Sequence, residues 1–189
     1  MKTAITPCTE ALLQLFFEAL SDEDAEVQSN AAFAIGLLVE HSSLDLSPHY
    51  MHVLAALRPH FTVAPNPPAA KLNARDNAAG AVSRMIVRNT SAVPLDQVLP
   101  VLFAALPLKN DYLENRPVFQ AIFHLFRSSP TVIVPYIDQL LPVFAFVLEP
   151  GPDQLGDETR IELLNLISAI NSENPAKIQA SGLSFHVNK

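Results

Sequence analysis

Cysteine and glycine are scarce in this sequence. Cys8 is the only cysteine among 189 residues, so no disulfide can form within the chain, and this usage suits a reducing compartment. There are only five glycines, which favours helices over a β-sandwich. Because 49% of the residues are apolar, the chain can form a folded domain with a sizeable core.

Basic residues are also few. The 12 lysines and arginines are outnumbered by 19 aspartates and glutamates, which leaves a formal net charge of −7. A protein that binds nucleic acid needs clustered lysine and arginine, so we expect no nucleic-acid partner. An acidic surface instead attracts basic partners and repels phosphate groups.

Sequence motifs of catalysis are lacking too. None of the short patterns that mark nucleotide binding, nucleophilic catalysis or zinc-dependent hydrolysis is present. Cys8 has no histidine close in sequence that would activate it as a nucleophile. His49 and His52 lie three residues apart, a spacing far more common among surface histidines than among metal ligands. We therefore expect no enzyme activity, no catalytic residue, no metal site and no cofactor.

The N-terminus does not have the charged and then apolar pattern of a signal peptide. The most hydrophobic stretch, residues 131–148, has about the length of a membrane span. It contains Asp138 near its centre and two prolines, Pro135 and Pro142, which favour a buried helix of a soluble protein. We expect no contact with a membrane.

The sequence does contain an internal repeat. The segments "QSNAAFAIGLLVE" (28–40) and "RDNAAGAVSRMIV" (75–87) align with Asn30 over Asn77, at an offset of 47 residues. Looser copies follow near residue 121 and over 159–170. An amphipathic apolar segment precedes each copy, at 10–22, 48–61, 95–108 and 134–149. A unit of helix A, turn and helix B at a period of about 40–47 residues is typical of HEAT repeats.

We therefore predict an all-α fold, an α-α superhelix (HEAT-repeat solenoid) of about four helix pairs. Such units cannot bury their own apolar faces and must stack on their neighbours. The predicted array covers residues 1–182, with repeats at approximately 7–42, 48–90, 93–129 and 130–171, and a tail follows at 183–189. Pro117 lies inside the third B segment and predicts that this helix starts near Asn115.

Asn30 and Asn77 occupy the same angular position on a helical wheel of the two B helices. If B helices line a concave face, a ladder of amides there can bind the backbone of an extended peptide, while acids hold its cations. The wheel adds further candidates to this cargo-binding face: Glu26, Asn73 and Asp76. Alternatively, the asparagines bond to the preceding turn or to an adjacent repeat and serve stacking alone.

The two repeated segments, and above all "LPLKNDYLENRPVFQAIFHLF" (106–126), resemble the C-terminal HEAT repeats of importin-β (karyopherin-β) nuclear transport receptors, closest to the importin-four branch. The resemblance covers roughly residues 8–182. It implies a receptor that shuttles between cytoplasm and nucleus and carries basic cargo, such as histone H3/H4 tails or ribosomal proteins. It also implies nucleoporins as partners of a full-length receptor, whereas we expect the repeats that bind Ran-GTP to be absent from this chain.

The resemblance assigns cargo binding to Asn77, Asp111, Glu114 and Asn115. For Asp111 and Glu114 the alternative is a solvated, capping role at a helix start. Two other interpretations of the whole chain remain open. One is a HEAT-repeat scaffold for complex assembly without a transport role. The other is a fragment without activity, whose apolar segment at 12–17 would promote association.

Overall fold

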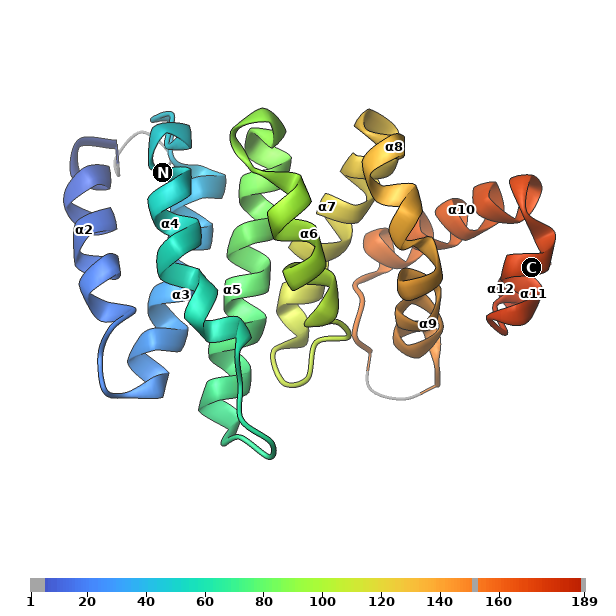
Figure 1. Cartoon of the computed structure of the whole chain (residues 1–189), viewed down its shortest axis with the longest axis horizontal. Coiled ribbons are helices and arrows are strands. Elements are labelled where there is room, and N and C mark those ends of the chain that lie inside the picture. Colours follow the sequence, from blue (N-terminus) through green and yellow to red (C-terminus); the bar gives the residue numbers. More distant parts are fainter. Residues whose placement is uncertain (1–5, 151–152, 188–189) are drawn as a thin grey trace. The chain divides into compact units, whose positions relative to one another are not determined.

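The computed structural model describes residues 6–150 and 153–187 (Figure 1). These residues form helices joined by turns, and no β-strand occurs among them, so the predicted all-α class is confirmed. The helices pack in the manner of HEAT repeats. The chain divides into two compact units, Met1–Val118 and Phe119–Lys189, and the boundary falls inside one helix.

The first unit contains alternating A and B helices, coloured blue to yellow-green in Figure 1. The A helices are α2 (Thr9–Ala19), α4 (Tyr50–Leu57) and α6 (Leu95–Ala104). The B helices are α3 (Ala25–His41), α5 (Ala69–Arg88) and the first residues of α7 (Asn115–Ser128). The 3-10 turn η1 (Thr6–Cys8) precedes α2, and four others lie between the helices: η2 (Ser47–His49), η3 (Arg58–Phe61), η4 (Thr90–Ala92) and η5 (Tyr112–Glu114).

The helix α3 illustrates why these segments fold as they do. Asp24 caps its N-terminus by accepting a hydrogen bond from the backbone N–H of Glu26 at 2.8 Å. Along its length, alanines and Gly36 leave room for a neighbouring helix. A Cβ built on Gly36 would lie 3.1 Å from the Cα of Ala81, so glycine allows α3 and α5 to pack side by side.

The helix α7 begins at Asn115, where the position of Pro117 predicted its start. Proline is tolerated in the first turn of a helix because the N–H groups there have no intrahelical partner. The start of α7 positions Glu114 of η5 beside Arg84 of α5 and Arg116 beside Glu40 of α3.

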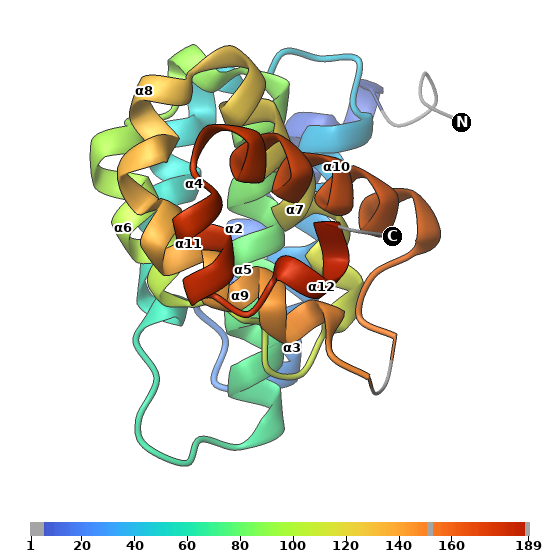
Figure 2. The same cartoon turned by 90° about the vertical axis from the view of Figure 1, so that its right-hand side faces the viewer.

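The second unit contains the remainder of α7, then α8 (Pro130–Ile133), η6 (Val134–Tyr136), α9 (Ile137–Leu148) and α10 (Asp157–Glu173). Two short helices, α11 (Pro175–Ala180) and α12 (Ser184–Val187), pack back on α10 (Figure 2). The core of the second unit includes the rings of Phe119 and Phe144, whose centroids are 5.9 Å apart. The predicted tail at 183–189 therefore contains α12, while residues 188 and 189 lie outside the described part of the chain.

Residues Pro130–Leu148, which comprise α8, η6 and α9, are long and apolar enough to cross a membrane. In the structure, 44% of this window is buried within the protein. The buried residues lie at helical spacing, with Ile137, Leu140 and Phe144 among them. This spacing is that of an amphipathic helix with one face in a core.

Candidate functional site

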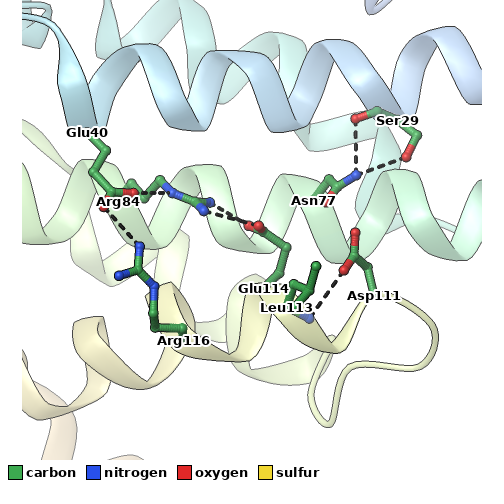
Figure 3. Close-up of polar contacts among 8 residues, drawn as sticks. All are labelled: Ser29, Glu40, Asn77, Arg84, Asp111, Leu113, Glu114 and Arg116. Atoms are coloured by element: carbon green, nitrogen blue, oxygen red, sulfur yellow. Dashed lines mark hydrogen bonds and ion pairs between the residues drawn. The ribbon is translucent and has the colours of Figure 1, made fainter. Parts of the chain in front are cut away.

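A buried ion pair links α5 to the turn before α7. Arg84 on α5 is only 6% exposed, and Glu114 in η5 is 1% exposed. The guanidinium of Arg84 donates through Nη1 to Oε2 of Glu114 at 2.5 Å and through Nη2 to Oε1 at 3.1 Å (Figure 3). This two-bonded geometry is the strongest form of an arginine–carboxylate contact.

Glu40 extends this pair into a chain of four charges. Oε2 of Glu40 accepts a hydrogen bond from Nε of Arg84 at 2.8 Å, and Oε1 accepts one from Nη2 of Arg116 at 3.1 Å. The sequence of contacts is therefore Arg116, Glu40, Arg84 and Glu114, and it joins α3, α5, η5 and the first turn of α7 (Figure 3). Two positive and two negative charges make this group neutral overall.

Burial and the ion pairs act in opposite directions on the carboxylates. For Glu114, burial raises the pKa, because leaving water disfavours the charged form, and Arg84 offsets this only in part. For Glu40, burial also raises the pKa. There the hydrogen bond and charge of Arg84, together with the charge of Arg116, outweigh it and lower the pKa below the usual value.

Gly80 makes room for the carboxylate of Glu114. A Cβ built on Gly80 would stand 1.4 Å from Oε2 of Glu114 and 2.8 Å from Nη1 of Arg84. Any side chain at position 80 would therefore expel Glu114 from its place on α5.

Asp76 holds the loop that precedes η5. Its Oδ2 accepts hydrogen bonds from three consecutive backbone N–H groups, those of Lys109 at 2.9 Å, Asn110 at 2.7 Å and Asp111 at 3.1 Å. Asn73, one turn earlier on α5, accepts a hydrogen bond from the side chain of Asn110 at 2.6 Å. The carboxylate of Asp76 is fully buried, so its role is to fix this loop on α5.

Asn77 joins the two B helices α3 and α5. Its side-chain amide donates to the backbone oxygen of Ser29 at 3.2 Å and to the hydroxyl of Ser29 at 3.0 Å (Figure 3). Asn30, at the equivalent position of α3, is exposed. The expected ladder of equivalent amides on one accessible face is therefore wrong for Asn77, because α3 covers that side of α5.

The eight predicted cargo-binding residues divide into two groups. Four are at most 5% exposed and make contacts within the chain: Asp76, Asn77, Glu114 and Asn115. Four remain accessible to a partner: Glu26, Asn30, Asn73 and Asp111. Asp111 has the alternative capping role as well, since it accepts a hydrogen bond from the N–H of Leu113 at 3.2 Å. A solvated capping role for Glu114 is wrong, because that side chain is buried against Arg84.

Sequence reasoning missed Glu40, Arg84, Arg116 and Gly80. One signal was available in the sequence. Arg84 is a charged residue within a run of small and apolar residues, and such a run predicts a helix that other helices bury, so Arg84 needed an acidic partner. Its two acidic partners stand 44 and 30 residues away, so spacing along one helix could not reveal them.

The accessible side of α3 combines acidic, amide and aromatic side chains. Glu26 and Asn30 are exposed, Phe33 is 37% exposed, and Glu40 follows two turns later. The ring of Phe33 lies 5.9 Å from the Cζ of Arg84, within cation–π range. A surface of this kind can bind a cationic side chain through its charge and its aliphatic stem together.

Comparison with known proteins gives consistent relatives. A HEAT repeat model matches residues 12–42, which include most of α2 and all of α3. The chain is 45% identical over 170 residues, 90% of its length, to probable importin subunit beta-4 of Schizosaccharomyces pombe. It is 29% identical over 178 residues, 94% of its length, to importin-4 of Homo sapiens. Both alignments cover 16% of the relative, so the chain spans about one sixth of the length of these proteins.

Proposed function

This chain belongs to the importin-β family, in its importin-4 branch, and we propose that it is a cargo-binding portion of a nuclear import receptor. The observation that carries the proposal is the accessible side of α3, where Glu26, Asn30, Phe33 and Glu40 present acid, amide and aromatic groups to a partner. Such a receptor works in the cytoplasm and the nucleus.

The cargo proposed here is a basic, extended protein segment, such as a histone H3/H4 tail or a lysine-rich part of a ribosomal protein. The net charge of −7 supports a cationic partner. Accessible amides such as Asn30 and Asn73 supply hydrogen bonds to a peptide backbone, whereas carboxylates supply the attraction to lysine. The accessible cargo contacts are therefore Glu26, Asn30, Asn73 and Asp111, with Glu40 added from the structure.

A second candidate function is docking of a partner protein on the A helices. A hollow of about 340 Å³ lies between α4 and α6, and its lining includes Met51, Val98 and Leu102. Met51 is 60% exposed at this hollow, so its flexible side chain offers apolar surface to a partner. This feature favours a scaffold role of the chain.

The experiment that tests cargo binding is a titration of the chain with a fluorescein-labelled, lysine-rich histone H3 tail peptide at low and at moderately high salt. We expect saturable binding that weakens with salt, because screening reduces attraction between exposed charges. A peptide with glutamine in place of every lysine is the control and should not bind. Absence of saturable binding at low salt would contradict the proposal.

A further inference from the structure

Glu40 is shared by two arginines that differ strongly in exposure. Arg84 is buried and also paired with Glu114, whereas the side chain of Arg116 is 56% exposed. Glu40 itself is 26% exposed, so a partner can reach its carboxylate. One oxygen of Glu40 faces each arginine (Figure 3).

Arg116 is the weakly held member of this group. Its contact with Glu40 is a single hydrogen bond of 3.1 Å from Nη2, and exposed pairs of this kind are screened by water and salt. Arg116 is also the second residue of α7, where the positive end of the helix dipole disfavours a cation. Displacing Arg116 into water therefore has a small cost, whereas displacing Arg84 would strand the buried carboxylate of Glu114.

The surface beside Glu40 suits the side chain of a basic residue. Phe33 and Leu37 stand seven and three residues before Glu40, on the same side of α3. Phe33 is partly exposed and Leu37 is half-buried, so both offer apolar surface for an aliphatic stem whose charged end reaches the carboxylate.

We propose that Glu40 binds a lysine or arginine side chain of the cargo, and that Arg116 occupies this contact as an internal substitute when cargo is absent. This inference rests on the proposed function. The exchange keeps Glu40 paired throughout, since one cation replaces another, and the fixed Arg84 holds the carboxylate in position for both. Arg116 thus competes with cargo and sets the affinity of the site.

The test compares Arg116→Gln with the wild-type chain in titrations with the labelled, lysine-rich histone H3 tail peptide. We expect about two- to fivefold tighter binding by the variant, the range that corresponds to loss of one exposed ion pair. Arg127→Gln is the matched control, because Arg127 is likewise exposed and pairs with a glutamate, but its partner is Glu162 and not Glu40. It removes the same charge and should leave the affinity at the wild-type value.

Glu40→Gln supplies the second arm. We expect roughly tenfold weaker binding of the peptide, and no further effect of Arg116→Gln in that background, because the competition requires the Glu40 carboxylate. Thermal unfolding establishes that each variant is folded. If Glu40→Gln does not fold, the comparison of Arg116→Gln with Arg127→Gln still shows whether Arg116 competes with the peptide.

Each other outcome has a defined meaning. Equal tightening by Arg116→Gln and Arg127→Gln would assign the effect to net charge and overturn the inference, as would unchanged affinity of Arg116→Gln. Both results leave the proposed function intact, since the wild-type chain binds. If neither the wild type nor any variant binds the peptide, the proposed function fails and the inference fails with it.

Discussion

The carboxylate of Glu114 lies against the backbone of Gly80, where a Cβ would approach Oε2 to 1.4 Å. Glu114 is also the main partner of Arg84. The network of Arg116, Glu40, Arg84 and Glu114 can therefore form only because residue 80 has no side chain. A glycine in the middle of α5 is costly for helix stability, and this contact explains why it is there.

Gly80→Ala should destabilise the protein. The substitution gains about 1 kcal/mol of helix propensity, but expelling Glu114 breaks a buried ion pair, which costs about 3–5 kcal/mol. We expect a net loss of roughly 2–4 kcal/mol in the free energy of unfolding, measured with urea. Gly156→Ala is the control, since a Cβ there meets nothing within 4 Å, and its cost should be about 1 kcal/mol or less. Wild-type stability of Gly80→Ala would show that Glu114 can move without loss.

Asn77→Ala and Asn30→Ala form a matched pair at equivalent positions of two B helices. Asn77→Ala removes two hydrogen bonds to Ser29 and leaves buried groups without a partner. We therefore expect the free energy of unfolding to fall by about 1–3 kcal/mol. Asn30 is exposed, and its substitution should change stability by less than about 0.5 kcal/mol. Instead, Asn30→Ala should weaken binding of the lysine-rich peptide. Equal stability losses in the two variants would contradict the distinction.

Asp76→Ala should release the loop that precedes η5. Three backbone N–H groups, at Lys109, Asn110 and Asp111, lose their common acceptor. We expect much faster amide hydrogen exchange at these three positions and a loss of at least about 2 kcal/mol in unfolding free energy. Asp24→Ala, which removes an exposed cap of α3, should leave exchange at 109–111 unchanged. Continued protection of the three amides in Asp76→Ala would refute the assigned role.

The lowered pKa of Glu40 makes part of the stability dependent on pH. A carboxylate whose folded-state pKa is below its unfolded value of about 4.5 stabilises the protein above that value. This contribution is lost as the pH falls through the folded-state pKa. The wild type should therefore lose more stability than Glu40→Gln between neutral pH and pH values below 4.5, as measured by urea unfolding at each pH. The raised pKa of Glu114 acts in the opposite sense, and because the charge of Glu40 contributes to that rise, the difference between the two proteins reports on the network around Glu40. Parallel pH profiles of the two proteins would argue against the ion pairs of Glu40.

Much of the secondary structure and the fold class could be predicted from the sequence. The spacing of apolar residues marked the B segments that became α3 and α5, and Pro117 marked the start of α7. The offset of 47 residues placed Asn30 and Asn77 at equivalent points. Such predictions succeed because helix formation and amphipathic spacing are local properties of the chain.

The environment of each side chain was decided by tertiary structure alone. Asn30 and Asn77 share a position in the repeat, but Asn77 is buried against α3, whereas Asn30 is exposed. Glu40 and Glu114 converge on Arg84 from segments 44 residues before it and 30 residues after it. A helical wheel gives the direction of a side chain from its own axis but not what lies in that direction. The sequence by itself therefore determined where the helices and the repeated positions lie. Which charges are buried, which are paired and which face a partner followed from how α3, α5 and η5 pack together.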